Sequence, residues 1–302
     1  MKKWISALLK CVIAAIAVYF ALRQVNWTEL KNLRWSASVA WLIPAIIFFN
    51  SSQFLSAYRL LQFYKLLDTA ISYLFNLRLY YTGMFYNLFL PGGIGGDVYK
   101  VFILKKKGLS FLQLTKATLL DRVTGLIVLL AIMAGLTNFI SVSFPGKEIL
   151  CLLFLAVIPG FLIYWLIVHL YFKPFGKSIP KAALLSVLIQ TCQLLAFFCL
   201  LLFFQTPLNE LLSYAALFFA GSVVAAIPVS IGGIGTRELA MATGAAYLDL
   251  SKTVAVSGSL MFFFITALSA LVGWLSVKHN FFNGGNTKIS KDSTGIKDNS
   301  IT

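Results

Sequence analysis

Six charged side chains lie inside or directly beside apolar stretches of this sequence, where ionisable groups are costly and mark functional candidates. They are Asp97, Lys100, Asp121, Arg122, Arg237 and Glu238. The basic residues suit phosphate binding, because arginine offers a two-pronged donor and lysine a compact positive charge. The acidic residues suit holding those bases in place, contacting a headgroup amine or carrying protons. The chemistry that this set favours is recognition of an anion in an apolar setting.

The same residues also have structural interpretations. Asp97 is a good helix N-cap, and Glu238 suits the electropositive start of a helix. Asp97 and Lys100 are also spaced for a simple ion pair. Further polar residues in apolar stretches either contact a substrate or hydrogen-bond between helices. These secondary candidates are Asn50, Gln53, Asn87, Gln190 and Gln193.

Two glycine-rich breaks must position the charged residues. Pro91–Gly96 interrupts the apolar stretch 71–104, and Pro228–Gly235 interrupts the stretch 211–248. A helix cannot run through such a cluster, and the freed backbone groups cannot face lipid, so each break must line an enclosed or watery cavity. A helix that restarts at depth has free N–H groups that favour an anion, and glycine allows close approach. The predicted binding residues therefore include Gly92, Gly93, Gly95, Gly96, Gly232, Gly233 and Gly235.

The composition indicates that these apolar stretches lie in a lipid bilayer. Of the 302 residues, 59% are apolar and 12% charged, whereas a soluble domain carries about 25% charged residues. The lysines and arginines behind the net charge of +15 are scattered between apolar runs, which favours lipid headgroup contacts and excludes nucleic-acid binding. The four cysteines and two histidines lack metal-ligand spacing, so we expect no metal site and no cofactor.

Six stretches are apolar and long enough to cross a bilayer, which takes about 20 residues. They run near 5–22, 36–56, 117–141, 149–172, 183–204 and 253–277. The predicted fold is therefore all-α and polytopic, with six full transmembrane helices and two glycine-broken re-entrant hairpins. If 71–90 and 211–228 cross fully, there are eight spans. We expect one transmembrane domain over 1–280 and a disordered polar tail over 281–302.

Two features recur at one spacing. The Gly-Gly-Ile-Gly motifs at 92 and 232 are 140 positions apart, and so are the polar clusters beginning at Asn50 and Gln190. This predicts two related halves, about 1–145 and 146–280. A cytoplasmic N-terminus places most basic loops and the C-terminus inside, with 23–35 as the exception. The hairpins then enter from opposite sides, which is an inverted repeat of the kind found in secondary transporters.

Three motifs carry a resemblance to a known family. They are Asn87–Asp97 (NLFLPGGIGGD), Asp121–Leu126 (DRVTGL) and Pro228–Glu238 (PVSIGGIGTRE). In order and spacing the chain resembles, over about 5–278, the lysylphosphatidylglycerol synthase transmembrane family, also called flippase-like proteins. The resemblance implies a multi-pass protein of the bacterial inner membrane. The family includes the membrane half of multiple peptide resistance factors, which moves aminoacylated phosphatidylglycerol between leaflets, and members linked to polyprenyl-phosphate sugar pathways. Those factors continue into a soluble aminoacyl-transferase domain where this chain has a short polar tail, so we expect no synthase activity.

The first functional hypothesis is a flippase that moves an anionic phospholipid or a polyprenyl-phosphate-linked lipid, with the hairpins meeting near the midplane and the halves rocking around them. No P-loop, nucleophile elbow or histidine-centred triad is present, so we expect no enzyme activity. The alternatives are a membrane-embedded headgroup transferase, with Asp97, Asp121 or Glu238 as base, and a non-transporting cell-envelope scaffold. The expected partner is a membrane lipid, with a homo-oligomer or an envelope-biosynthesis protein as further possibilities.

Overall fold

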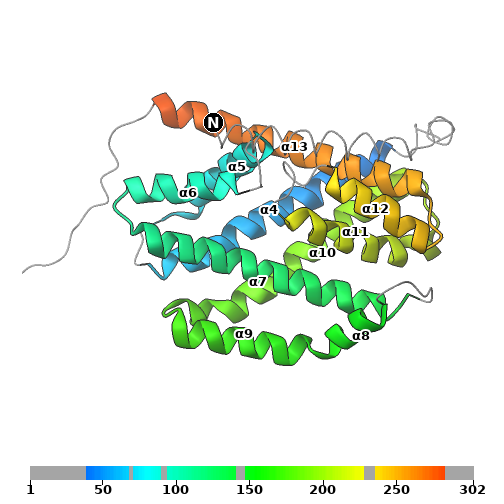
Figure 1. Ribbon diagram of the computed structural model, residues 1–302. Coiled ribbons are helices and arrows are strands. Elements are labelled where there is room, and N and C mark those ends of the chain that lie inside the picture. The colour runs from blue at the N-terminus through cyan, green and yellow to red at the C-terminus, as the bar shows by residue number, and fades with distance from the viewer. Residues whose placement is uncertain (1–38, 68–70, 90–93, 141–146, 228–234, 283–302) are drawn as a thin grey trace, which may run out of the picture.

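The computed structural model describes residues 39–67, 71–89, 94–140, 147–227 and 235–282 (Figure 1). Over these ranges the chain forms α-helices and short 3-10 turns and no strand, which confirms the predicted all-α class. The first group of helices is α4 (Leu42–Lys65), α5 (Tyr73–Phe89), α6 (Gly95–Lys106) and α7 (Phe111–Thr137). The second group is α8 (Lys147–Leu155), α9 (Val157–Tyr171), α10 (Ile179–Phe203), α11 (Leu211–Ala226), α12 (Thr236–Tyr247) and α13 (Lys252–Phe282). The 3-10 turns are η1 (Val39–Trp41), η2 (Phe175–Ser178) and η3 (Leu208–Glu210).

The described chain has the helices of a polytopic membrane protein. Five helical segments are long and apolar enough to cross a bilayer, and they are Val39–Lys65, Phe111–Thr137, Phe175–Phe203, Leu208–Ala226 and Lys252–Gly273. Four correspond to predicted spans, and the one at 208–226 is the first arm of the second broken stretch. The predicted span 5–22 lies outside the described residues.

One predicted span is not a single helix. The stretch 149–172 is divided at Ala156 into α8 and α9. Pro159 accounts for the break, because it has no N–H to donate to Leu155, the last residue of α8, and its ring collides with that carbonyl. The backbone resumes with the Gly160 N–H donating to the carbonyl of Ala156 at 2.8 Å.

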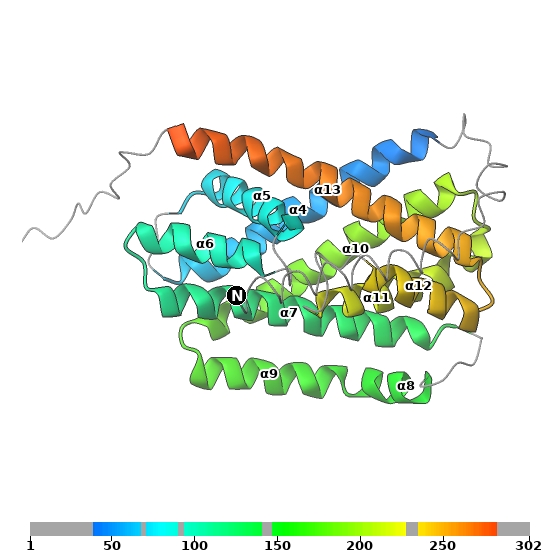
Figure 2. The same ribbon diagram turned by 45° about the horizontal axis from the view of Figure 1, so that its top comes forward.

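Both broken stretches fold as a longer helix packed against a shorter one, as predicted. α5 contacts α6, and α11 contacts α12. Figure 2 shows the α5–α6 pair at one end of the bundle and the α11–α12 pair at the other, with the starts of α6 and α12 directed toward the middle. In the first pair the backbones touch, because a Cβ at Gly96 would overlap the carbonyl oxygen of Gly83. The break residues 90–93 and 228–234 lie outside the described ranges.

The helices of the two groups recur in one order. Four helix starts in the second group follow those in the first by 137 to 141 positions: Leu42 and Ile179, Tyr73 and Leu211, Gly95 and Thr236, Phe111 and Lys252. The packing recurs as well, because α5 contacts α13, and α11, its counterpart, contacts α7, the counterpart of α13. α4 and α10 are counterparts and contact each other.

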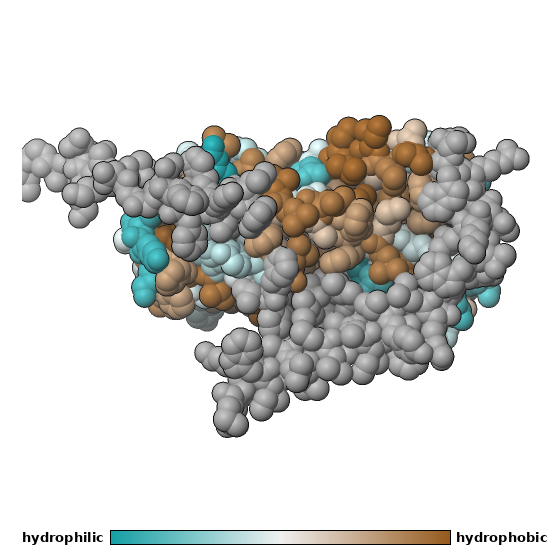
Figure 3. All heavy atoms as spheres, turned by 90° about the horizontal axis from the view of Figure 1, so that it is seen from above, coloured by the Kyte–Doolittle hydropathy of each residue, from teal (hydrophilic) through white to brown (hydrophobic). Residues whose placement is uncertain are grey.

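The outer surface is apolar. Large aliphatic and aromatic side chains are exposed on many helices, among them Ile43, Leu119, Ile163, Leu188 and Phe264. Figure 3 shows one face on which apolar residues predominate toward the middle of the part drawn in colour. Such a surface is stable only against hydrocarbon.

Candidate functional site

The first hairpin places Asp97 between two cations. Asp97 lies in the first turn of α6, and Lys100 is one turn later on the same face. The Lys100 Nζ lies 2.6 Å from Asp97 Oδ1, and Arg122 of α7 contacts Oδ2. Asp97 and Lys100 are buried, while the Arg122 side chain is 42% exposed. Two of the predicted phosphate ligands are therefore neutralised in part by a carboxylate of the protein.

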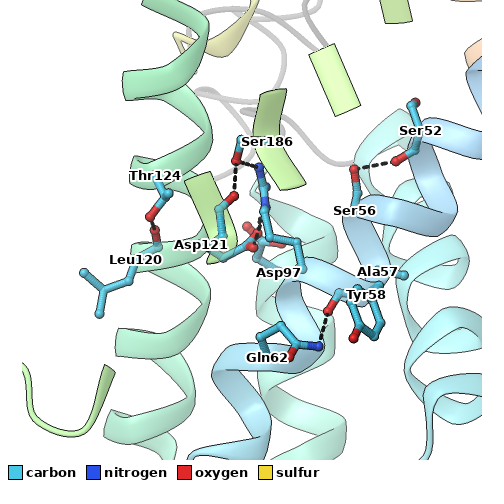
Figure 4. A network of polar contacts seen from close by, with 12 residues as sticks. Ser52, Ser56, Ala57, Tyr58, Gln62, Asp97, Leu120, Asp121, Thr124 and Ser186 are labelled. Carbon is cyan, nitrogen blue, oxygen red and sulfur yellow. Dashed lines mark hydrogen bonds and ion pairs between the residues drawn. The ribbon is translucent and has the colours of Figure 1, made fainter. Parts of the chain in front are cut away.

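Asp121 forms a second buried ion pair, with a residue that we did not predict. The Arg59 Nε and Nη2 donate to its two carboxylate oxygens at 2.8 and 3.1 Å. The Arg59 Nη1 also donates to the Ser186 hydroxyl of α10 at 2.7 Å. Figure 4 shows Asp121, Ser186 and Asp97 in one region between the helices. This pair joins α4, α7 and α10.

A glycine makes room for this pair. A Cβ at Gly125 would lie 2.8 Å from the Arg59 Nη1, so a larger residue there would displace the guanidinium. The sequence prediction ended the second span at 56 and assigned Arg59 to a loop, whereas α4 continues to Lys65. The missed signal is the spacing of Ser52, Ser56 and Arg59, which places three polar residues on one helix face.

Asn87 caps the start of α6. Its Oδ1 accepts a hydrogen bond from the Gly96 N–H at 2.7 Å. Sequence reasoning predicted that free N–H groups here would face an anion, but a carboxamide from α5 takes this one. Lys100 also lies 4.8 Å from the centre of the Tyr80 ring. Many of the polar groups in the first hairpin are thus paired with other groups of the protein.

Glu238 has a structural role at the start of α12. One carboxylate oxygen accepts the Gly235 N–H at 2.6 Å, and the other accepts the Ser259 hydroxyl of α13 at 2.8 Å. Gly235 has a φ of 84°, which disfavours any residue with a Cβ. Glu238 therefore holds the turn before α12 and joins it to α13, consistent with the predicted electrostatic role at a helix start.

Arg237 has a different environment. Its guanidinium carbon lies 4.9 Å from the Phe218 ring centre and 4.6 Å from that of Phe262. Its Nε and Nη2 are buried and have no hydrogen-bond partner in the part of the chain that the structure describes. Over the same residues no carboxylate forms an ion pair with it. Arg237 is thus a part-buried cation that lies against two aromatic rings and has two buried nitrogens available to an acceptor.

Two of the secondary candidates, Asn50 and Gln53, lie on α4 and form hydrogen bonds within the protein. Asn50 of α4 donates to the Ser269 hydroxyl at 3.1 Å and accepts from the Tyr81 hydroxyl at 2.8 Å, so it links three helices. Gln53 donates to its neighbour Ser52 at 3.0 Å.

Gln190 and Gln193 lie on α10, and Gln190 is buried. Of the predicted glycines, Gly95, Gly96 and Gly235 begin or precede helices, and the other four (Gly92, Gly93, Gly232 and Gly233) lie outside the described residues.

Together, the apolar helices and the charged side chains between them define a polytopic membrane protein with polar sites inside its helix bundle. The family model described as the lysylphosphatidylglycerol synthase TM region matches residues 7–273, and the chain belongs to this family. Membership relates the protein to lipid metabolism or transport. No curated protein and no solved structure gave a significant match.

Proposed function

We propose that this protein binds the phosphate of an anionic lipid at Arg237 and moves that lipid between the two leaflets. The single observation that carries the proposal is that two buried guanidinium nitrogens of Arg237, Nε and Nη2, have no hydrogen-bond partner among the described residues. Removing a charge from water costs several kcal/mol even after relaxation, and two aromatic faces return only about 2 kcal/mol or somewhat more. A bound anion would supply the missing charge and the missing hydrogen-bond acceptors together.

The first hairpin supports an anionic ligand as well. Lys100 and Arg122 carry two positive charges against the single negative charge of Asp97, so this group keeps a net charge of +1. An ion pair that is already formed binds an added anion less strongly than an unpaired cation does. The headgroup phosphate therefore belongs at Arg237, with the first group as a weaker, second positive region.

The helix arrangement supports movement of the lipid. Hairpins that enter from opposite ends, in halves of matching helix order, are the expected features of an inverted repeat with alternating access. The basic residues at the ends of α6 and α9 and the start of α10 lie at one end of the bundle, which by the positive-inside rule is the cytoplasmic end.

The transferase alternative receives less support. Each candidate base is already engaged: Asp97 with two cations, Asp121 with Arg59, and Glu238 with a backbone N–H and a hydroxyl. A general base must be within reach of the proton that it removes, and these carboxylates are held by the protein instead. We therefore favour binding and transfer of an intact lipid.

The test is phosphatidylglycerol binding to the purified protein in nanodiscs of phosphatidylcholine, followed by native mass spectrometry. Arg237→Gln should weaken binding by about 30-fold or more, because removing one partner of a buried charge pair costs roughly 2–5 kcal/mol. Arg78→Gln is the matched control, since Arg78 is exposed. In liposomes with fluorescent phosphatidylglycerol in both leaflets, the wild type should make the inner-leaflet label accessible to dithionite, and Arg237→Gln should leave that label protected. Equal binding by both variants would refute the site, and absent transfer by the wild type would refute transport.

A further inference from the structure

A groove lies between α7 and the α8–α9 segment, and no charged side chain lines it. Its volume is about 260 Å³. All of the side chains that line it are apolar, among them Ile127, Leu130 and Ala131 on α7 and Ala156, Val157 and Gly160 on the other side. None of these residues contacts Arg237 or Asp97 in the interactions described above, so the groove is a separate feature.

Small residues and a helix break create the groove. Ala131 of α7 lines the groove together with Ala156 and Gly160, beside the break between α8 and α9. Where small residues meet in membranes, they normally let two backbones approach closely. Here a Cβ added at Gly160 would meet no atom within 4 Å, so the space remains open.

The groove is closed at both ends. At one end α7 and α8 touch, because a Cβ at Gly135 would lie 3.2 Å from the Phe154 ring. At the other end the hydroxyl groups of Thr124 and Tyr164 lie 2.8 Å apart and join α7 to α9. From Ile127 to Ala134, the groove-lining part of α7, the helix rises by about 10 Å. One leaflet of the hydrocarbon core is about 15 Å thick, so the groove fits within one leaflet.

The side of α9 away from the bundle faces hydrocarbon. Leu162, Ile163 and Leu166 are between 48% and 59% exposed, as expected for a lipid-facing helix. We infer that the groove binds one acyl chain of a membrane phospholipid, held between α7 and α9. The apolar lining, the length and the position at the lipid surface all specify this occupant. The site is independent of the headgroup site at Arg237.

The experiment uses the full chain in nanodiscs of phosphatidylethanolamine and phosphatidylglycerol, with a trace of phosphatidylglycerol carrying a diazirine in one acyl chain. After illumination, mass spectrometry of the peptides locates the adducts. We expect enrichment of at least fivefold on residues 127–134 and 156–161 over the lipid-facing residues of α13. Gly160→Leu should remove that enrichment without unfolding the protein, because its side chain enters open space. Ala131→Leu should do the same, and Ala246→Leu, on an exposed position of α12, should leave it unchanged.

Three results would overturn the inference. These are adducts spread evenly over the lipid-facing helices, enrichment that persists in Gly160→Leu, and disulfide-linked dimers of Gly160→Cys, which would show a second copy in the groove. Arg237→Gln separates this inference from the proposed function, because it should abolish headgroup-dependent binding and leave the acyl adducts in place.

Discussion

The two hairpins use equivalent positions for opposite chemistry. Asp97 and Arg237 are 140 positions apart, and so are Arg122 and Phe262. In the first hairpin Asp97 contacts Arg122, and in the second Arg237 lies against Phe262. The same pair of helix positions is therefore in contact twice, once as an ion pair and once as a cation over a ring. The packing of the helices is the same in both hairpins, but among the described residues Arg237 has no carboxylate in the position where Asp97 has Arg122.

The buried ion pair between Arg59 and Asp121 has no equivalent in the second half. The positions matching Arg59 and Asp121 are Cys199 and Met261, which lie in or against an apolar cluster. A fold that accepts apolar residues at these positions in one half does not need an ion pair there for packing. The pair in the first half thus adds specificity, since its third hydrogen bond reaches Ser186 in the other half.

The largest expected effect comes from breaking this pair. Arg59→Met should lower the free energy of unfolding by about 3–5 kcal/mol, because it leaves the Asp121 carboxylate buried without a partner. Arg59→Met with Asp121→Met, which copies the apolar character of the second half, should recover most of the loss. Thermal unfolding in detergent, followed by size-exclusion chromatography, measures both. A double variant as unstable as the single one would show that the pair itself, and not the lone charge, controls stability.

The backbone contact of the first hairpin gives the next effect. Gly96→Ala should cost about 1–3 kcal/mol, because its Cβ overlaps the Gly83 carbonyl and α5 must move away from α6. The equivalent residue in the second hairpin is Thr236, where the structure already accommodates a side chain. Thr236→Ala is therefore the matched variant, and its cost should be below about 1 kcal/mol. The same thermal unfolding assay measures both variants. Equal losses of stability in Gly96→Ala and Thr236→Ala would contradict the predicted difference between the two hairpins.

The sequence predicted the helical membrane class, both broken stretches and the charged residues after each break. These features follow from composition and from Pro/Gly clusters, which act locally. The partners of those charges could not be predicted, because they depend on packing between distant segments. Arg59 meets Asp121 across 62 positions, and its role became visible only once α4 extended to Lys65. The split of α8 from α9 was missed because Pro159 lies within an otherwise continuous apolar run.

The sequence also could not predict which side chains accept hydrogen bonds from the backbone N–H groups that follow each break. Asn87 and Glu238 both accept an N–H at the start of a short helix, but Asn87 does so from the preceding helix and Glu238 from its own first turn. A glycine cluster predicts unsatisfied N–H groups without specifying which side chain accepts them. The environment of Arg237 likewise depends on tertiary packing, since Glu238 is adjacent in sequence but hydrogen-bonds to Gly235 and Ser259 instead.

Glu238→Gln should also have only a small effect on stability, and it compares the residues that cap α6 and α12. The amide oxygen can still accept the Gly235 N–H, so the loss should stay near or below about 1 kcal/mol. Removing the negative charge next to Arg237 should meanwhile strengthen phosphatidylglycerol binding a few-fold, because a nearby charge contributes on the order of 1 kcal/mol at an effective dielectric of about 20. Asn87→Ala should cost about as much stability without strengthening binding. If Glu238→Gln and Asn87→Ala changed phosphatidylglycerol binding equally, the headgroup would not bind preferentially at the second hairpin. The two hairpins would then differ in structure but not in lipid binding.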